Sequence, residues 1–484
     1  MNLQTKYFIF IAIITLLFCL SIGFDITPLL RGPAPYPPEW QWDYLFVNTM
    51  DKLYLPLIVT GLLLGLFWSH ETKNIFKKNQ PLLIVLLIIL SFLFQFSVLY
   101  FSRSGIPVLI HRIINPELNS YFTASLQISD PIYFLKNYET EMQQFIYHAR
   151  SHPPGAILIF YGIKQLIQPF TSFINFATTI SPNHTDVKQI WNLLLPIEKA
   201  TAIFSAFFLP FLSTLTIVPI FKTAKKLYGE KIAIRSSFLF IFLPSIVLFI
   251  PINDIFLPLF SAGAFYFLVK GLQDKHTFSF LISGLILFIG TTFNLALLPL
   301  LLLFFLFALF FIQKNKLKLI NYFKHGSFFA LGFFLPPLLL YFFVDFNFLR
   351  LIDIILQEVP HIHTRSYTTW LFYNVYDFLI FVGIPLAIVF LTQSKQLFAL
   401  RSKLFAKIDI LFLAFLIMFL IVDLTGSTRG ETGRIWSIFM PFLLLPAVVY
   451  LTNNKKFSTN LFIGILLLQT LQILVLQEFW VMLW

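Results

Sequence analysis

Long apolar runs separated by short polar breaks follow one another along the whole chain. The runs are about 17–25 residues long, which is enough for a helix to cross the hydrocarbon core of a bilayer. They lack the period-2 alternation that is typical of transmembrane barrels. The pattern therefore predicts about 13 helical spans, near residues 6–24, 53–69, 81–101, 196–221, 235–251, 254–270, 277–294, 295–313, 326–344, 373–393, 408–423, 435–451 and 459–477.

The composition agrees with this pattern. Of the 484 residues, 58% are hydrophobic and 12% are charged, and the charged fraction of a soluble domain is about twice as high. We therefore expect an all-α integral membrane protein, a polytopic helical bundle with amphipathic surface helices in one large outer loop. The single cysteine, Cys19, excludes an intrachain disulfide.

The net charge of +12 does not indicate a nucleic-acid-binding protein, because the basic residues fall in short clusters between the apolar runs. This distribution is typical of cytoplasmic loops in a multi-pass protein, here expected in the plasma membrane. The basic clusters are 73–78, 222–235, 314–324, 395–407 and 453–456. The loops that should then face outward are 25–52, 102–195, 251–254, 345–372 and 425–434.

The longest outward loop, 102–195, should form short amphipathic helices at the membrane surface. Both of its ends lie on the same side of the membrane, so the apolar stretch 155–180 cannot be one simple crossing. Pro169 interrupts this stretch, and Lys164 adds a charge. We expect helices that lie in the outer interface or dip into the bilayer and return. The alternative is one miscounted crossing.

Three acidic residues in the outward loops attract attention. Glu117 could either complement a helix dipole or hold a carboxylate that accepts a proton at a membrane-level cavity. Asp254 lies in a tight hairpin with no cation adjacent in sequence, where a carboxylate costs several kcal/mol unless it is paired or functional. Asp130 precedes a proline and is expected to cap a helix.

Histidines and arginines of the same loops could bind an anionic group. His148 and His152 are four residues apart, but His152 precedes a proline, so contact with phosphate or sugar, or ordering of the loop, is expected in place of metal ligation. Arginines suit phosphate, and nearby glycines let backbone N–H groups approach an anion, although these loops could also contact lipid headgroups. The candidate donor-binding residues are His148, Arg150, His152, His361, His363, Arg365, Arg429 and Arg434, with Glu431 between the last two.

Carboxylates and cations on one face of a membrane suit transfer from a phosphate-linked donor. The cations would stabilise the leaving phosphate, and a carboxylate would accept the proton of the nucleophile. Many spans suit a lipid donor that is drawn from the bilayer.

Several short features occur in a recognisable order. They are Glu117 four residues before Tyr121 in "ELNSYFTAS", the "HPP" of His152, Pro153 and Pro154, the "KKLYG" of 225–229, and Pro244 followed by Asp254. Together they resemble the GT-C superfamily of membrane glycosyltransferases, in its protein O-mannosyltransferase and aminoarabinose-transferase branch. The resemblance covers about 102–270, and Glu117 stands where this branch usually has an aspartate.

The resemblance implies an inverting glycosyltransferase of EC class 2.4. It would move a sugar from a polyprenyl-phosphate donor to a lipid, glycan or protein acceptor at the outer membrane face, with Glu117 and Asp254 as catalytic residues. No cofactor is certain, and a divalent metal is a further candidate. The corresponding domains are an N-terminal membrane hairpin with its outer loop (1–80), a catalytic membrane module (81–313) and C-terminal membrane helices (314–484).

Two other functions compete with this one. A transporter or flippase of lipid-linked glycans needs charged or broken helices near mid-membrane, whereas the charges here lie mostly at span ends. A glycan polymerase or ligase would share the outer arginines, but the two carboxylates disfavour it.

Overall fold

The computed structural model describes residues 2–182, 185–358, 364–399 and 409–482. Within these ranges the regular structure is helical, and the one strand-like pairing is an isolated antiparallel bridge between Tyr44 and Trp480. The predicted all-α fold is confirmed. His361 and His363 lie outside the described residues.

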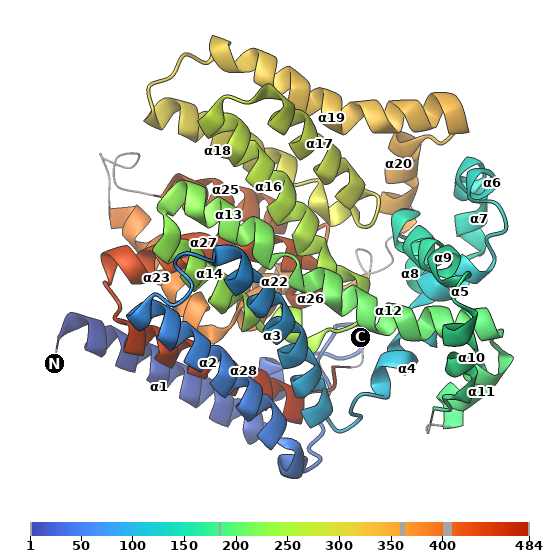
Figure 1. The fold of residues 1–484 in the computed structure, drawn as a ribbon, viewed down its shortest axis with the longest axis horizontal. Coiled ribbons are helices and arrows are strands. Elements are labelled where there is room, and N and C mark those ends of the chain that lie inside the picture. The colour runs from blue at the N-terminus through green and yellow to red at the C-terminus, as the bar shows by residue number, and fades with distance from the viewer. Residues whose placement is uncertain (1, 183–184, 359–363, 400–408, 483–484) are drawn as a thin grey trace.

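Nine helical stretches of the described chain are long and apolar enough to cross a membrane. Each coincides with a predicted span, so the polytopic architecture is confirmed (Figure 1). They are Leu3–Gly23 (α1), Met50–Lys73 (η2, Met50–Lys52, and α2, Tyr54–Lys73), Gln80–Phe101 (α3), Pro196–Tyr228 (α12, Pro196–Thr214, and α13, Ile217–Tyr228), Asn253–Asp274 (η4, Asn253–Phe256, and α16, Leu257–Asp274), Leu295–Lys314 (η5, Leu295–Leu297, and α18, Leu300–Lys314), Tyr322–Val344 (in α19, Ile320–Val344), Thr432–Asn454 (α26, Thr432–Ile435, to α27, Met440–Val449) and Thr459–Phe479 (α28).

The four remaining predicted spans coincide with shorter or interrupted helices. Pro244 separates two of these helices, and Gly383, whose φ of +103° suits glycine, separates another two. The helices are α14 (Glu230–Ile241) with α15 (Pro244–Leu248), α17 (Thr277–Thr291), α22 (Tyr367–Val382) with α23 (Ile384–Ala399), and α25 (Ile410–Thr425). The total of about 13 crossings therefore stays a prediction.

The long outer loop folds into short helices that lie together at the right of Figure 1. The apolar stretch 155–180 bends by 111° between two of them, as either a broken span or a re-entrant pair of helices would, so whether it crosses the membrane stays a prediction. The helices are α4 (Val108–Ile114), α5 (Ser120–Leu126), α6 (Pro131–Lys136), α7 (Tyr138–Glu141), α8 (Tyr147–Arg150), α9 (Gly155–Ile167), α10 (Thr171–Thr179) and α11 (Thr185–Leu193). An ion pair of 3.0 Å between Arg350 of α20 (Phe348–Glu358) and Glu139 ties this group to the helix that follows α19.

Helix starts follow from local sequence. Asn79 accepts a hydrogen bond from Leu82 N–H at the start of α3, and Ser458 caps α28 in the same way. Each such cap satisfies a backbone donor that the helix leaves unpaired and contributes about 1 kcal/mol.

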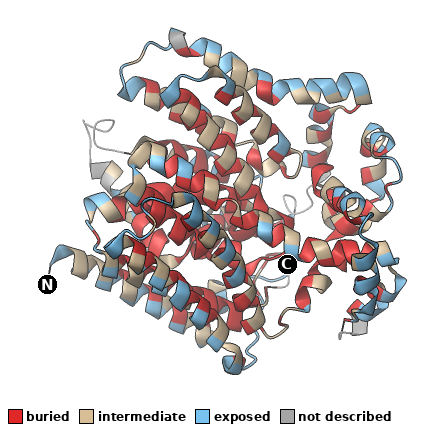
Figure 2. Cartoon of the chain, in the orientation of Figure 1, coloured by how far each residue is buried: buried red, intermediate tan, exposed pale blue. Residues whose placement is uncertain are grey.

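The centre of the bundle is formed by the helices near the C-terminus and by α14 and α16 (Figure 2). In the apolar window of 432–454, 83% of residues are buried, compared with 11% for Tyr322–Val344. The C-terminal segment is therefore surrounded by protein, whereas few residues of α19 are buried. This central position brings the segment that starts with α26 against the hairpin that carries Asp254.

Candidate functional site

Asp254 lies in η4, at the start of α16, and is not isolated. Its Oδ2 lies 3.3 Å from Nε of Arg434, and its Oδ1 accepts a hydrogen bond of 3.3 Å from Nδ2 of Asn294. The Ser437 hydroxyl donates to its backbone carbonyl at 3.1 Å. The cation that the local sequence lacks is therefore supplied by the segment 432–437, far along the chain.

Arg434 contacts two carboxylates. Its Nη2 donates to Oε2 of Glu431 at 2.6 Å, while its Nε faces Asp254 without hydrogen-bond geometry. Glu431 has a φ of +57°, a left-handed conformation that turns the backbone just before α26. All three side chains are largely buried, with exposed fractions of 8–14%. A single guanidinium thus holds two carboxylates in a place with little solvent.

Tyr121 and His152 bring the outer loop to this ion-paired group. Their rings lie 5.4 Å apart in an edge-to-face arrangement, and the Tyr121 ring is 6.4 Å from that of His148. Nδ1 of His152 is 2.9 Å from the carbonyl of His148, which can only accept, so Nδ1 carries the proton.

Burial lowers the pKa of His152, and the nearby Asp254 partly offsets this effect. Burial raises the pKa of Tyr121 well above its usual value, and Asp254 raises it further. Both groups are therefore neutral at pH 7, and both feel the charge of Asp254. The HPP turn therefore lies close to the Asp254 hairpin.

The HPP turn is fixed from three sides. The Tyr138 hydroxyl donates to the carbonyl of His152 at 2.7 Å. Gly155 N–H donates to the carbonyl of Thr292 at 2.7 Å, and a Cβ at Gly155 would lie 2.4 Å from that oxygen. Asn253 Nδ2 donates to the carbonyl of Ala156 at 3.4 Å. The start of α9 is thereby wedged between the end of α17 and η4.

The other predicted residues of the long loop lie apart from this group. Glu117 is exposed in the turn between α4 and α5, and its N–H donates to Asn115 Oδ1 at 2.9 Å. No hydrogen bond or ion pair joins its side chain to Asp254 among the described residues. Asp130 accepts from Ile132 N–H at 2.9 Å and so caps α6 as predicted, while Arg150 is exposed at the end of α8.

Arg365 and Arg429 form a reciprocal pair beside the ion-paired group. Nη1 of each donates to the backbone carbonyl of the other at 2.6 Å. Burial lowers the pKa of Arg365, and Glu431 and Glu39 partly offset this effect. The two predicted arginines are therefore brought together, and Glu431 lies close enough to influence one of them.

Several residues that contact the site were not predicted from the sequence. Asn294 contacts Asp254, and Asn374 and Asp377 of α22 bind the backbone of the 425–434 loop. Glu39 of the N-terminal loop accepts from Ser366 N–H at 3.0 Å and from Trp370 Nε1 at 2.6 Å. The one sequence feature that pointed to a role for the N-terminal loop was its tryptophan- and proline-rich stretch "RGPAPYPPEWQWDY".

The described residues contain no group of three or more His, Cys, Asp or Glu side chains that could hold a metal ion. The two carboxylates of this group, Asp254 and Glu431, both face Arg434, a cation that already offsets their charge. A divalent metal therefore stays a prediction.

Residues 191–340 match the sequence model of a family described as dolichyl-phosphate-mannose-protein mannosyltransferase. This segment includes Asp254 and Asn294. A search of curated proteins gave no match.

Two solved structures, both of the oligosaccharyltransferase from Archaeoglobus fulgidus, resemble the chain weakly. One, a complex with Zn and sulfate, has a TM-score of 0.38 and 11% identity, covering 81% of this chain and 53% of that chain. The other, a complex of AglB with an inhibitory peptide and a dolichol-phosphate, has a TM-score of 0.37 and 12% identity, covering 84% and 56%. The chain spans a little over half the length of these proteins, and similarity this weak carries no functional argument.

The order of features from Glu117 to Asp254 predicted this relationship, and the family match covers its second half. Residues 191–340 are therefore similar to a mannosyltransferase family, in a chain whose described residues include nine helical stretches long and apolar enough to cross a membrane.

Proposed function

We propose that the protein transfers a sugar from a polyprenyl-phosphate donor to an acceptor at the outer face of the plasma membrane. The observation that carries the proposal is the ion-paired group of Asp254, Arg434 and Glu431, which lies against Tyr121 and His152. Asp254 belongs to the segment that matches the mannosyltransferase family. A carboxylate, a cation and hydrogen-bonding groups are the parts that this transfer needs.

In the proposed reaction, the acceptor's hydroxyl oxygen attacks the anomeric carbon of the donor sugar. The bond between that carbon and the phosphate oxygen breaks, and the polyprenyl phosphate leaves with the bonding electrons. A carboxylate accepts the hydroxyl proton. Arg434 would stabilise the charge that develops on the leaving phosphate, and its low solvent exposure strengthens that interaction.

We propose Asp254 and Glu117 as the catalytic carboxylates, either of which could accept the proton. Asp254 sits beside the cation that would bind the phosphate, so it suits orientation of the sugar and of Arg434. Glu117 is exposed, so an acceptor could reach it. His148, Arg150, His152, His361, His363, Arg365 and Arg429 remain the proposed donor-binding residues.

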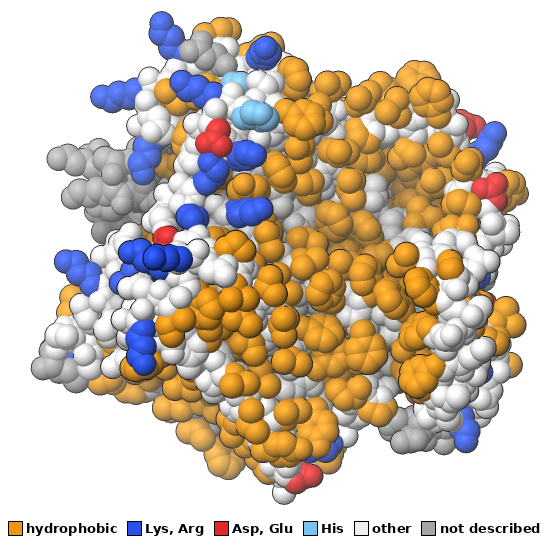
Figure 3. Space-filling view, viewed as in Figure 1, with side chains coloured by type: hydrophobic (Ala, Val, Ile, Leu, Met, Phe, Trp, Pro, Cys, Tyr) orange, Lys and Arg blue, Asp and Glu red, His pale blue; other side chains and the backbone are white. Residues whose placement is uncertain are grey.

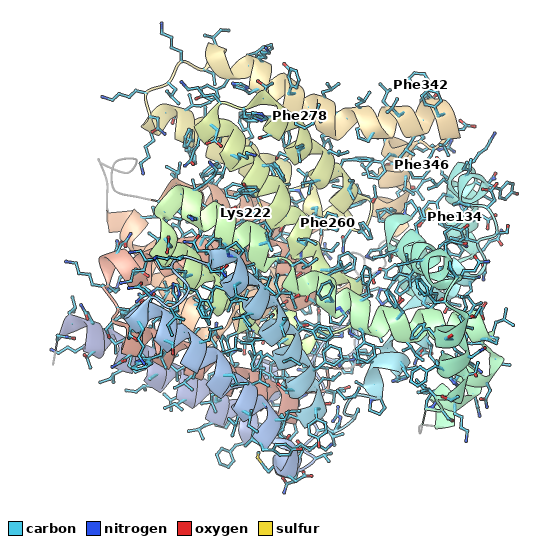
Figure 4. All side chains as sticks on the ribbon, in the orientation of Figure 1. Phe134, Lys222, Phe260, Phe278, Phe342 and Phe346 are labelled. Atoms are coloured by element: carbon cyan, nitrogen blue, oxygen red, sulfur yellow. The ribbon has the colours of Figure 1, made fainter. Side chains whose placement is uncertain are left out.

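The surroundings of Asp254 suit a lipid. Phe256 follows it in η4, and its ring packs against Phe293 with centroids 5.4 Å apart. Phe260 stacks on the same Phe293 at 5.3 Å. Figure 3 shows a largely hydrophobic face that is hollowed below α19, on the side of the outer-loop helices. Figure 4 places Phe260 on α16 beside this region. An apolar chain could lie along this hydrophobic face near Phe260.

The ends of α16 support an outward site. Asp254 precedes its first turn, whereas Asp274 at its last turn pairs with Lys226 at 2.7 Å. Lysines and arginines gather at that second end, over the ends of α13, α16 and α18 (Figure 3). An 18-residue helix is about 27 Å long, close to the thickness of a bilayer core. By the positive-inside rule the basic end would be cytoplasmic and Asp254 would face outward.

The test uses the full-length protein in nanodiscs with radiolabelled mannosyl-phosphate polyprenol as the probe donor. Release of polyprenyl phosphate and of labelled mannose, to water or to added acceptors, is measured for the wild type and the variants Asp254→Asn and Glu117→Gln. Glu141→Gln and Asp353→Asn, which remove acidic side chains elsewhere on the outer helices, are the matched controls.

We expect donor turnover by the wild type and both controls, and its loss in Asp254→Asn. Wild-type turnover in both site variants would overturn the site assignment. In sealed liposomes, movement of the lipid-linked sugar with no new glycosidic bond would favour a transporter instead.

A further inference from the structure

The N-terminal loop 25–52 is not a peripheral addition, because it contacts α22 beside the ion-paired site. We propose that Asp377 of α22 is a positioning residue that fixes the loop carrying Glu431 and Arg434, and that Trp42 completes its hydrogen bonds. The proposal rests on the proposed function for its catalytic consequence, while its structural part can be tested without turnover.

Asp377 is a buried carboxylate with donors on both oxygens. Gly433 N–H donates to its Oδ2 at 2.7 Å. The Thr432 hydroxyl lies 3.2 Å from the same oxygen and also donates to the Asn374 carbonyl at 2.7 Å. Oδ1 accepts from the indole Nε1 of Trp42 at 3.1 Å. Gly433 immediately precedes Arg434, so the position of the guanidinium depends on this carboxylate.

Asn374, one turn earlier on the same face of α22, holds the preceding part of the loop. Its Oδ1 accepts from Gly430 N–H at 3.1 Å, and its Nδ2 donates to the Thr428 carbonyl at 2.8 Å. Backbone from 428 to 433 is thus fixed by two side chains of one helix. Since an irregular loop has no hydrogen-bond ladder of its own, such side chains decide its conformation.

Trp42 also contacts the hairpin that leads to Asp254, the partner of Arg434 in the ion pair. Its ring lies 5.6 Å from that of Phe249, in the hairpin that leads to Asp254, and 5.2 Å from Phe381 of α22. Glu39, three residues earlier, binds Ser366 and Trp370 at the start of α22. The N-terminal loop therefore contacts both segments that meet at Asp254 and Arg434, and it can set their relative position.

An asparagine at position 377 would separate a positioning role from simple packing. Asparagine has nearly the shape of aspartate, but it offers one acceptor oxygen and one NH₂ donor. Its NH₂ group would have to face a donor, either Trp42 Nε1 or Gly433 N–H. If Trp42 is replaced by phenylalanine, the NH₂ group can turn toward the ring and leave the oxygen for Gly433.

The experiment compares Asp377→Asn, Trp42→Phe and the double variant in nanodiscs. Trp480→Phe is the matched control: its ring stacks on Trp42 with centroids 6.1 Å apart, and its Nε1 has no hydrogen-bond partner among the described residues. Hydrogen–deuterium exchange of a peptide covering 425–436 reports on the loop, and kcat and KM for the mannosyl-phosphate polyprenol probe report on the site.

We expect Asp377→Asn to speed exchange in this peptide and to lower kcat about 10–100-fold with a smaller change in KM, because misplacement by about 1 Å can cost that much. Adding Trp42→Phe should restore most of the lost protection and rate, and Trp480→Phe should leave both near wild type.

Additive losses in the double variant, or equal losses in Trp42→Phe and Trp480→Phe, would overturn the proposal. A wild type with no turnover would instead count against the proposed function, and the exchange data would still decide whether Asp377 and Trp42 hold the loop.

Discussion

Two buried ion pairs sit at different places in this bundle, and they differ in how completely their charges are satisfied. Arg235 of α14 binds Glu71 of α2 through two nitrogens, at 3.3 and 2.7 Å. Arg434 meets Asp254 through a single nitrogen at 3.3 Å and shares its remaining bonding with Glu431. We call the first pair closed, because every guanidinium nitrogen of Arg235 has a hydrogen-bond partner. We call the second pair open, because Nε of Arg434 has no hydrogen-bond partner in the described part of the chain.

The surroundings of Arg235 complete its bonding. Its Nη1 donates to Thr452 Oγ1 at 3.3 Å and to the Phe457 carbonyl at 3.0 Å, and its guanidinium lies 4.9 Å above the Phe462 ring. The side chain has no exposed surface. Such an arrangement holds helices together and leaves no direction from which a ligand could bind.

The pair at Asp254 has the opposite character. Its side chains keep 8% and 14% of their surface exposed, and two titratable groups from another part of the chain, Tyr121 and His152, feel its charge. The comparison shows that a buried charge does not by itself indicate a functional site. Incomplete bonding, residual exposure and convergence of distant segments separate the site from a structural ion pair.

The largest expected effect comes from Asp254→Asn. Removing the carboxylate should lower the rate of transfer by about 10²–10⁴-fold, the usual contribution of a positioned acid or base. Stability should change little, because Arg434 keeps Glu431 as a partner. Turnover of mannosyl-phosphate polyprenol and the melting temperature by tryptophan fluorescence are the measurements. A collapse of stability with unchanged turnover per folded molecule would erase the distinction between the two pairs.

The Gly155→Ala variant should have the next largest effect on transfer. The added Cβ would lie 2.4 Å from the Thr292 carbonyl and would push the HPP turn away from the Asp254 hairpin. We expect a loss of up to about 100-fold in kcat/KM. The control is Gly162→Ala in the same helix, where a Cβ would meet nothing within 4 Å. Equal losses in both variants would show that α9 responds to any change in its sequence.

Glu71→Gln tests the closed pair. It leaves Arg235 buried without a counter-charge, which typically costs about 3–5 kcal/mol of stability. Transfer per folded molecule should stay at the wild-type level. Chemical or thermal unfolding in detergent measures the stability, and single-turnover kinetics measure the rate of transfer per folded molecule. A variant that is stable but slow would mean that this end of the bundle takes part in catalysis.

The smallest effect concerns pH. Burial lowers the pKa of His152 below its unfolded value of about 6.5. Below that pH the unfolded chain binds a proton that the folded chain resists, so stability should fall as pH drops and level off above it. His152→Asn keeps a donor toward the His148 carbonyl but cannot titrate. Melting temperatures at pH 5 and pH 7.5 should therefore differ less in the variant, and an unchanged difference would remove His152 as the cause.

Much of the fold followed from local pattern. All nine long apolar helices coincide with predicted spans, and the bend near Pro169 and the cap at Asp130 were also anticipated. The reason is that a bilayer forces each apolar segment to satisfy its backbone internally, so a helix is determined by its own residues. The division of two predicted spans into shorter helices, at Pro244 and at Gly383, was not predicted from the pattern alone.

The sequence by itself therefore determined the class of the protein, the positions of its helices, the sidedness expected from its basic loops and the family resemblance. Only the tertiary structure decided which charges meet. Asp254 finds its cation in the last third of the chain, and the position of that cation depends on Asp377 and Trp42 from two other segments. Helical periodicity relates residues three or four apart. Contacts between residues more than a hundred positions apart exist only once the bundle has packed.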